Sequence, residues 1–369
     1  MKTTHQLLTG DARFTKFDRD SIDLVITSPP YPMIAMWDEA FSVMSPESKV
    51  ALDSRDGQLA WELMHEALDL VWSSIFGGMK EGGIACINIG DATRTVDESF
   101  RLYPNAARIT NGMIGAGFTP LPDIIWRKPT NAPNKFMGSG MLPPGAYVTY
   151  EHEYILIFRK GKKRSFSSEA QKQNRRKSAY FWEERNRWFS DIWQNISGIH
   201  QMLASESLRD RSGAFPFTLP MRLIQMYSVY GDTVLDPFVG TGTTMAAAIA
   251  SARSSVGIEI DTGLHPKISE YIRLGAEASG EIAQRRIRAH LESTLERTAS
   301  SGEVKHNNVH YGFPVVTTQE RLMELPSSAT IVSTPDESAP KRLWTADHVI
   351  GLAQGHNDKT DIALEVSAK

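Results

Sequence analysis

A serine, two prolines and a tyrosine follow one another where an apolar run ends. The run Asp23–Ile26 is β-branched and leads into Thr27-Ser28-Pro29-Pro30-Tyr31. It predicts a buried strand, which must end at the prolines because they cannot donate ladder hydrogen bonds. The prolines fix the backbone so that the Ser28 hydroxyl and the Pro29 carbonyl can accept hydrogen bonds from one exocyclic amino group. Tyr31 offers a flat face on which a base can stack. The simpler alternative is a rigid turn with a packed tyrosine.

A second group of residues could hold a nucleoside. The run Thr233–Asp236 predicts a strand, followed by a loop with Gly240-x-Gly242 and an alanine-rich helix at residues 245–252. The next predicted strand, at residues 255–260, carries Glu259, whose carboxylate can accept both ribose hydroxyls. The third glycine of a dinucleotide fingerprint is absent, and no lysine follows the glycines as in a P-loop. The predicted ligand is therefore an adenosine without a pyrophosphate, which favours S-adenosylmethionine over NAD or ATP.

The elements around these motifs alternate between strands and helices. Apolar residues recur at helical spacing over residues 58–79, and strands are predicted at 84–89, 124–126 and 154–158. A long amphipathic helix is predicted from Pro266 to about residue 297. This alternation is typical of an α/β fold, with a doubly wound, mostly parallel sheet. The polar tail from residue 300 carries no informative pattern.

One segment differs sharply in charge from the rest of the chain. Residues 159–188 carry eleven Lys or Arg against three Glu, a balance of +8, whereas the whole chain has a net charge of −3. Aromatic residues are interspersed, at Phe166, Tyr180, Phe181, Trp182 and Trp188. Such a mixture suits phosphate neutralisation and base stacking. The alternative is a solvated basic linker.

Composition limits the class of protein. Hydrophobic residues make up 41% of the 369 residues and charged residues 22%, which is enough to bury a sizeable core. Because the sequence has no long apolar run and no signal peptide, we expect a cytoplasmic protein without membrane contact. Cys86 is the only cysteine, which excludes disulfides and cysteine-based zinc sites.

Taken together, the two motifs resemble those of the S-adenosylmethionine-dependent DNA amino-methyltransferases, whose catalytic signature is Asp/Asn/Ser-Pro-Pro-Tyr/Phe/Trp. The serine form is similar to the cytosine-N4 branch of restriction–modification enzymes. The catalytic motif lies about 200 residues before the glycine loop, as in the permuted group called β. The resemblance covers roughly residues 8–262 and implies a Rossmann-like methyltransferase fold, permuted, with an inserted target-recognition segment.

The resemblance also implies a division of the chain and a set of site residues. We expect a catalytic half at residues 1–160, a target-recognition segment at 161–200, a cofactor-binding half at 201–298, and a C-terminal extension at 299–369. The implied catalytic residues are Ser28, Pro29, Pro30 and Tyr31. The implied cofactor-binding residues are Asp11, Thr27, Phe215, Asp236, Pro237, Phe238, Gly240, Gly242, Thr243 and Glu259. The implied DNA-binding residues are Lys162, Lys163, Arg164, Arg175, Arg176 and Lys177.

The implied reaction is methyl transfer from S-adenosylmethionine to the N4 amino group of cytosine in double-stranded DNA, after the base has been flipped out of the duplex. No metal is expected. Cytosine-C5 chemistry is disfavoured because Cys86 follows Ala85 rather than the usual proline. Two alternatives stay open, adenine-N6 methylation and a DNA-binding module without turnover. A cognate restriction endonuclease and a homodimer stay open as partners.

Overall fold

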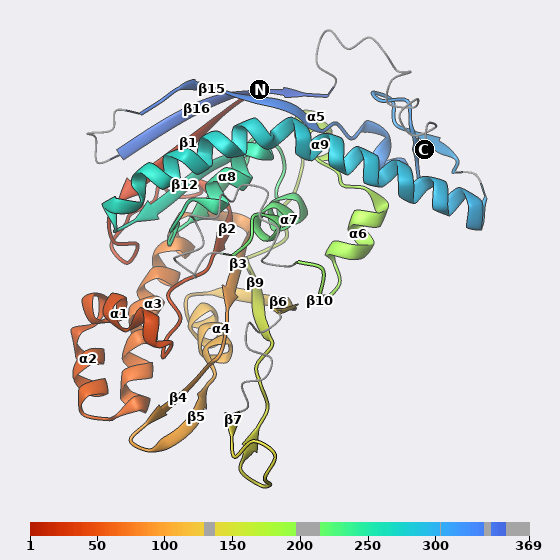
Figure 1. The fold of residues 1–369 in the computed structure, drawn as a ribbon. Helices are drawn as coiled ribbons and strands as arrows, with labels where there is room; N and C mark the ends of the chain where they lie inside the picture. The colour runs from red at the N-terminus through yellow and green to blue at the C-terminus, as the bar shows by residue number, and fades with distance from the viewer. Residues whose placement is uncertain (129–136, 197–214, 303, 336–340, 352–369) are drawn as a thin grey trace.

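The centre of the molecule is one large sheet (Figure 1). The computed structural model describes residues 1–128, 137–196, 215–302, 304–335 and 341–351. Within this part the sheet has ten strands. Their spatial order is β10 (Ile192–Trp193), β6 (Phe118–Arg127), β9 (His152–Lys160), β3 (Met79–Ile89), β2 (Ile22–Thr27), β11 (Thr233–Asp236), β12 (Ser254–Glu259), β1 (Lys2–Thr9), β16 (Lys341–Ile350) and β15 (Pro326–Ser333).

The middle of the sheet is parallel, and its flanks are mostly antiparallel, with a short parallel pair of β10 and β6 at one end. Strands β3, β2, β11, β12 and β1 pair in parallel, whereas β9 runs antiparallel between β3 and β6. Strands β16 and β15 add antiparallel pairs beside β1. The predicted α/β fold with a mostly parallel sheet is therefore confirmed. Strand β2 is buried along its whole length, because it lies in the middle of the sheet and both faces are covered.

Helices cover the two faces of the sheet, as a doubly wound fold requires. Side chains alternate across a strand, so Val25 packs into the cluster that contains α3 (Gly57–Gly78) and α4 (Asn105–Gly115). Its neighbours Leu24 and Ile26 pack on the other face. The helices of that face are α7 (Thr218–Tyr227), α8 (Thr243–Ala250) and α9 (His265–Ser301).

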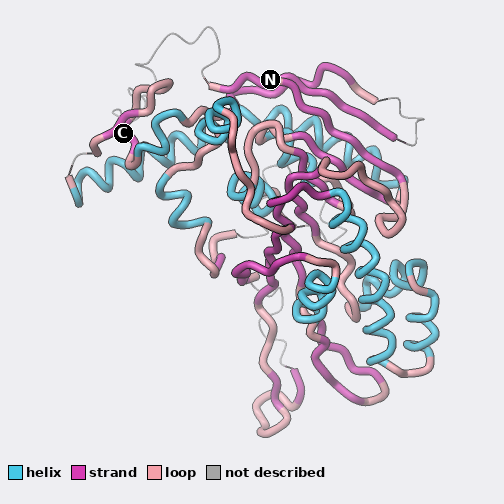
Figure 2. The backbone as a smooth tube through the Cα atoms, turned by 180° about the vertical axis from the view of Figure 1, so that it is seen from behind, coloured by secondary structure: helices cyan, strands magenta, loops and turns pink. Residues whose placement is uncertain are grey.

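The remaining described elements are short. The helices are η1 (Ala35–Trp37), α1 (Asp38–Met44), α2 (Pro46–Asp53), α5 (Glu169–Lys177), α6 (Trp182–Trp188), η3 (Thr262–Leu264) and η4 (Thr318–Leu322). Three hairpins are formed by β4 (Ala92–Val96) with β5 (Ser99–Tyr103), β7 (Met137–Gly138) with β8 (Ala146–Tyr147), and β13 (His306–Asn307) with β14 (Pro314–Val315). The first two project together from the body of the molecule (Figures 1 and 2). Phe100 and Tyr147 stack between them, with ring centroids 4.7 Å apart.

Most predicted elements are present, with shifted ends. The helix predicted at residues 58–79 is α3, and the long helix predicted after Pro266 is α9. The strand predicted at 84–89 is part of β3, which begins earlier, at Met79. Residues 80–83, between the predicted helix and the predicted strand, belong to β3, and Gly82 adopts a left-handed φ of 80° where the register with β2 shifts.

The structure corrects two details of the sequence interpretation. Two of the five aromatic residues of the basic segment cannot stack on bases, because Phe181 and Trp188 are 0% and 2% exposed and pack in the core. The polar tail, whose sequence carries no informative pattern, nevertheless forms part of the fold, because β15 and β16 extend the sheet next to β1. The division into two halves and an inserted segment stays a prediction. Among the described helices, none has the length and apolar composition needed to cross a membrane.

Candidate active site

The catalytic motif and the cofactor motif meet at the carboxyl ends of two neighbouring strands. Thr27 ends β2 and Asp236 ends β11, and these strands pair in parallel. The Thr27 hydroxyl donates a hydrogen bond of 2.7 Å to Asp236 Oδ1, and the Thr244 hydroxyl donates one of the same length to Oδ2. Burial raises the pKa of Asp236 to about 6, against the opposing effect of these hydrogen bonds. Two motifs 209 residues apart in sequence thus share one buried carboxylate.

The glycine loop curls around the end of the next strand. Gly240 and Gly242 have φ angles of 53° and 89°, which glycine adopts without strain. A Cβ at Gly242 would also lie 3.2 Å from the backbone of Ile268. Glu259, which ends β12, accepts hydrogen bonds of 2.9 Å from the Gly240 and Asp261 amides, one on each oxygen. Burial raises the pKa of Glu259. Each oxygen keeps lone-pair capacity for a ribose hydroxyl.

The other predicted cofactor residues differ in their surroundings. Asp11, at the end of β1, is held by Arg13, whose Nε lies 3.0 Å from both carboxylate oxygens. This ion pair engages the carboxylate that the resemblance assigned to the cofactor. Phe215 is buried in the cluster of the α7 face, and Pro237 and Thr243 are buried as well, whereas Phe238 is half-buried.

The Ser-Pro-Pro-Tyr motif is part of a hydrogen-bonded network that the sequence did not reveal. The Tyr31 hydroxyl lies 3.2 Å from Ser28 Oγ, 2.7 Å from Asn88 Nδ2 and 3.0 Å from Glu153 Oε2. Asn88 Nδ2 also donates to Glu153 Oε2 at 2.8 Å, and Lys128 Nζ lies 2.7 Å from Glu153 Oε1. Burial, and then the Glu153 carboxylate, raise the pKa of Tyr31 well above its ordinary value, which keeps it a neutral phenol.

The pairing of strands β3 and β9 places Glu153 in the site. In the antiparallel pairing of β3 with β9, Ile89 lies opposite Tyr154, which brings Glu153 to the carboxyl end of β3. In the sequence Glu153 stands next to His152 and belongs to neither of the two motifs. The signal that could have identified Glu153 is its position at the start of the strand that pairs with the strand of Asn88. That signal becomes visible only when the direction of β9 is known.

The predicted DNA-binding residues lie at the opposite edge of the sheet. Arg164 binds Asp232 at 2.6 Å and Asp23 at 3.5 Å, both at the amino ends of parallel strands. Asp23 lies five positions before Ser28 along an extended chain, a distance of about 16 Å. Arg176 and Lys177 belong to α5, whose Asn174 contacts the Tyr230 carbonyl just before β11.

Four of the six predicted DNA-binding side chains have partners within the molecule. Arg175 lies over the Phe166 ring, Arg176 pairs with Glu169, and Lys177 pairs with Glu324 at 2.8 Å. Lys162 and Lys163 are exposed on the turn after β9. The structure therefore brings the predicted catalytic and cofactor residues together at one edge and leaves the six predicted DNA-binding residues at the other.

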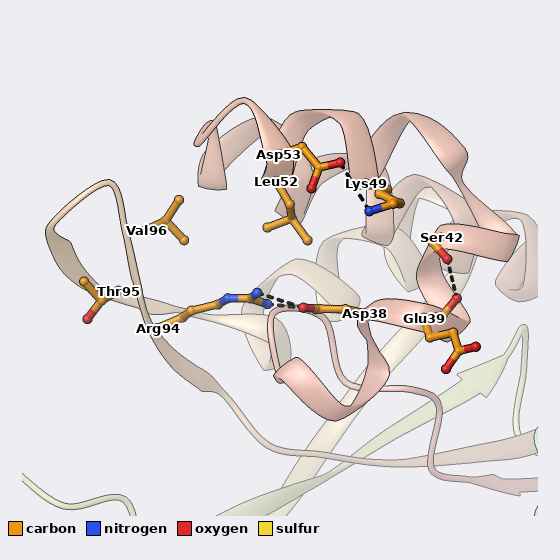
Figure 3. A pocket seen from close by; sticks show the side chains of 9 residues that line it. All are labelled: Asp38, Glu39, Ser42, Lys49, Leu52, Asp53, Arg94, Thr95 and Val96. Carbon is orange, nitrogen blue, oxygen red and sulfur yellow. Dashed lines mark hydrogen bonds and ion pairs between the residues drawn. The ribbon is translucent and has the colours of Figure 1, made fainter.

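A surface hollow between α1, α2 and β4 does not include any residue of these motifs (Figure 3). Four of its five charged side chains pair with one another. Arg94 forms two hydrogen bonds of 2.7 Å with Asp38, and Lys49 lies 3.2 Å from Asp53. The hollow is therefore not the place where the predicted chemistry would occur.

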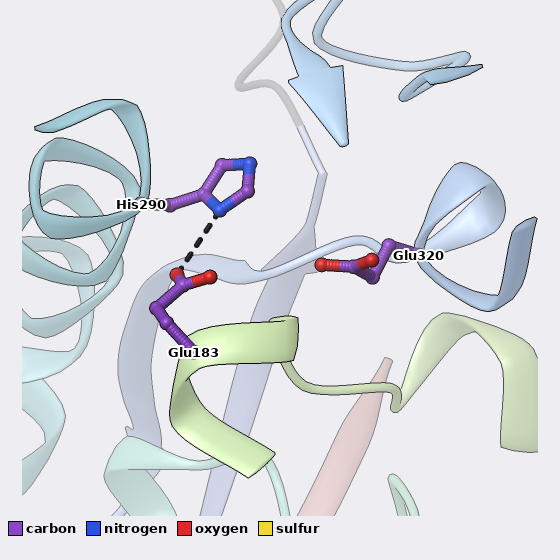
Figure 4. A group of neighbouring side chains, drawn as sticks. All are labelled: Glu183, His290 and Glu320. Carbon is purple, nitrogen blue, oxygen red and sulfur yellow. Dashed lines mark hydrogen bonds and ion pairs between the residues drawn. The ribbon is translucent and has the colours of Figure 1, made fainter. Parts of the chain in front are cut away.

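Glu183, His290 and Glu320 lie close together in the described part of the chain, at a spacing that could suit a metal ion (Figure 4). Both ring nitrogens of His290 already face acceptors, Glu183 Oε1 at 3.0 Å and the Pro314 carbonyl at 2.8 Å. The Glu320 oxygens accept backbone N–H groups, one from Trp182 and one from Thr317. The hydrogen bonds to Glu183 and Pro314 raise the pKa of His290 despite its burial. The cluster joins α6 and α9 to the C-terminal loops.

Comparison with known proteins agrees with this geometry. The N6/N4 DNA methylase family matches residues 22–270. The chain belongs to this family. It is 48% identical over 327 residues to the type II methyltransferase M.MthZI of Methanothermobacter thermautotrophicus, covering 88% of this chain and 91% of that protein. It is 46% identical to M.MjaI of Methanocaldococcus jannaschii, covering 77% and 97% of the two chains.

Solved structures extend the comparison to the fold. TTHA0409 of Thermus thermophilus, whose crystal structure contains S-adenosylmethionine, is 31% identical, with a TM-score of 0.56 over 73% of this chain and 93% of that one. The cytosine-N4-specific PvuII methyltransferase is 19% identical, with a TM-score of 0.53 over 72% and 85%, and shares the fold. The chain is thus a DNA amino-methyltransferase of the restriction–modification type, as the motifs predicted.

Proposed function

We propose that this DNA amino-methyltransferase acts on the N4 amino group of cytosine in duplex DNA, after flipping the base out of the stack. The methyl donor is S-adenosylmethionine, the predicted cofactor, in accord with the family and with the complex of the related Thermus protein. When bound, it supplies a methyl group on a positively charged sulfur. The residues that fit it are Glu259 for the ribose and the Gly240–Gly242 loop, whose backbone a ligand can approach closely.

The observation that carries the proposal is the direction of the hydrogen bonds at Ser28. The Glu153 carboxylate can only accept, and the Asn88 amide nitrogen can only donate. Tyr31 has a single proton, which must therefore go to Glu153. The contact between Tyr31 and Ser28 then requires Ser28 to donate its own proton. Towards a bound base, Ser28 can act only as an acceptor.

A hydrogen-bond acceptor at this position requires a target group on the base that donates a hydrogen bond. Cytosine N4 and adenine N6 are amino groups and donate hydrogen bonds, whereas thymine O4 and guanine O6 only accept. The Ser28 oxygen and the Pro29 carbonyl can hold an amino nitrogen and turn its lone pair out of the ring plane. Positioning of this kind supplies much of the barrier reduction in a direct transfer. The serine form of the motif favours cytosine over adenine.

The duplex must approach the edge of the sheet that carries Ser28. The β7–β8 hairpin projects from this edge, because it is inserted between the end of β6 and the start of β9, where Arg127 and His152 pair. Residues 137–150 contain no charged side chain. Met141, Leu142 and Val148 are 81%, 71% and 80% exposed. Apolar side chains of this kind can enter between base steps and unstack them. We propose that this hairpin contacts the duplex, with the basic segment as the competing surface.

The target base can be identified directly from the product. Genomic DNA from a methylation-deficient bacterial strain would be incubated with the protein and S-adenosylmethionine, digested to nucleosides and analysed by mass spectrometry. We expect N4-methylcytosine, reduced tenfold or more by Ser28→Ala, and no 5-methylcytosine. N6-methyladenine as the sole product would contradict the choice of cytosine and leave the amino-methyltransferase assignment intact. Absence of any methylated amino base would contradict turnover by this chain.

A further inference from the structure

The hydrogen-bonded network at Ser28 ends on a carboxylate that the sequence motif does not contain. Ser28 donates to Tyr31 over 3.2 Å, and Tyr31 donates to Glu153 Oε2 over 3.0 Å. Both hydroxyl protons therefore point in one direction, away from the base and towards Glu153. Such a series of hydroxyls can pass a proton along without moving any heavy atom.

The reaction produces a proton that has to leave. When the amino nitrogen attacks, its lone pair forms the new N–C bond, the S–C bond of the donor breaks, and that electron pair stays on sulfur. The nitrogen now carries a positive charge and must lose one hydrogen to become the neutral methylamine. The Pro29 carbonyl can accept a hydrogen bond from this group, but it is too weak a base to keep the proton.

We infer that Glu153 takes up this proton through Ser28 and Tyr31. The nitrogen gives its proton to Ser28 Oγ, Ser28 gives its own to Tyr31, and Tyr31 gives its own to Glu153 Oε2. Ser28 and Tyr31 end as neutral hydroxyls, and Glu153 ends as a carboxylic acid. The raised pKa of Tyr31 fits this role, because the phenol holds its proton until the transfer. The inference rests on the proposed function and adds a role for Tyr31 beyond stacking.

The surroundings of Glu153 suit a carboxylate that gains a proton during the reaction and later returns to its ionised form. Glu153 is 12% exposed, and its partner Lys128 is 52% exposed. Protonation of Glu153 therefore leaves the Lys128 charge in contact with water, where it costs little. Asn88, which donates to both Tyr31 and Glu153, keeps their oxygens in line. Asn88 is a positioning residue in this arrangement, and Glu153 acts through Tyr31.

The test measures a single turnover of methyl transfer to unmethylated genomic DNA, with saturating S-adenosylmethionine. Tyr31→Phe keeps the ring and removes the linking hydroxyl, and Glu153→Gln keeps the shape and removes the base. General acid–base groups contribute about 10²–10⁴-fold, so we expect each variant to lose at least tenfold. Because both changes interrupt one relay, the double variant should lose no more than the worse single variant. Affinity for S-adenosylmethionine should stay within twofold.

Two further measurements separate a proton acceptor from a structural carboxylate. Glu153→Ala should regain activity when sodium formate is added and not with sodium chloride at equal ionic strength. Glu151→Gln, which removes a neighbouring carboxylate that pairs with Arg127, should keep the parental rate. A parental rate in Tyr31→Phe, multiplying losses in the double variant, or no response to formate would overturn the relay. A parent protein that methylates no amino group would instead contradict the proposed function.

Discussion

Glu259 shows how a residue can be assigned a role from its place at a strand end. Its two oxygens receive one backbone amide each, from Gly240 and Asp261, which fixes the carboxylate at the edge where the glycine loop begins. Asp11 was implied by the family resemblance instead, and its carboxylate is held by Arg13. Glu259 therefore keeps lone pairs that a ligand can use, whereas the Asp11 carboxylate is engaged by Arg13.

Replacement of Glu259 tests the cofactor site. We expect Glu259→Ala to weaken binding of S-adenosylmethionine by about 1.5–3 kcal/mol, the range for losing charge-assisted hydrogen bonds. Isothermal titration calorimetry on the folded protein measures the change. Glu277→Ala, which removes an exposed carboxylate that pairs with Arg273 on α9, is the matched control. Equal affinities of Glu259→Ala and the parent would remove Glu259 from the site.

At the scale of elements, local patterns were readable and pairings between distant strands were not. The strand before Ser28 and the loop at Gly240 could be predicted because prolines and glycines act on their own backbone. The role of Glu153 could not, because it depends on the antiparallel register of β9 with β3. The burial of Phe181 was missed for a similar reason, since its ring stacks on His290 of α9, with ring centroids 4.0 Å apart.

The β7–β8 hairpin and the basic segment make different predictions for DNA binding. If the hairpin helps to unstack the target, Met141→Ala with Leu142→Ala should slow methylation of duplex DNA about tenfold and spare single-stranded DNA, which needs no flipping. Leu295→Ala with Val309→Ala is the control pair, since these side chains are 59% and 57% exposed elsewhere. Equal losses on both substrates would contradict a role in flipping.

The basic segment is tested by salt. If Arg175, Arg176 and Lys177 contact phosphates, replacing all three with alanine should reduce the slope of log affinity against log salt by about one unit per lost contact. Affinity for S-adenosylmethionine should not change. A slope equal to that of the parent would show that these side chains serve internal contacts, such as the pair between Lys177 and Glu324.

At the scale of the whole molecule, strands from the two ends of the described chain pair with each other in the sheet. Strand β16 pairs with β1, and the Met1 amino group donates to the His348 carbonyl at 2.8 Å. The Thr3 hydroxyl lies 2.9 Å from His5 Nε2 and 2.7 Å from His348 Nε2, and His5 Nδ1 lies 2.8 Å from Ser255 Oγ. One row of buried polar groups therefore joins β1 to β16 on one side and to β12 on the other.

This row should make the edge sensitive to acid. Burial, followed by repulsion from His348, lowers the pKa of His5 to about 3. Burial, followed by repulsion from the amino terminus, lowers the pKa of His348 to about 4. Both rings are neutral in the folded protein, whereas the unfolded chain binds protons below about pH 6.5. Their contribution to stability is therefore complete above pH 6.5 and is lost as the pH falls towards 4.

Removing one histidine isolates this effect from the other titrating groups. We expect His348→Gln to make the free energy of unfolding less dependent on pH between 6.5 and about 4, by up to about 1.4 kcal/mol per pH unit, which corresponds to one proton. Denaturant titrations of parent and variant at several pH values give the difference, in which shared groups such as Asp236 cancel. Thr345→Ser, on the same strand, controls for disturbance of β16. A pH dependence unchanged in His348→Gln would show that the folded protein already binds a proton at this edge.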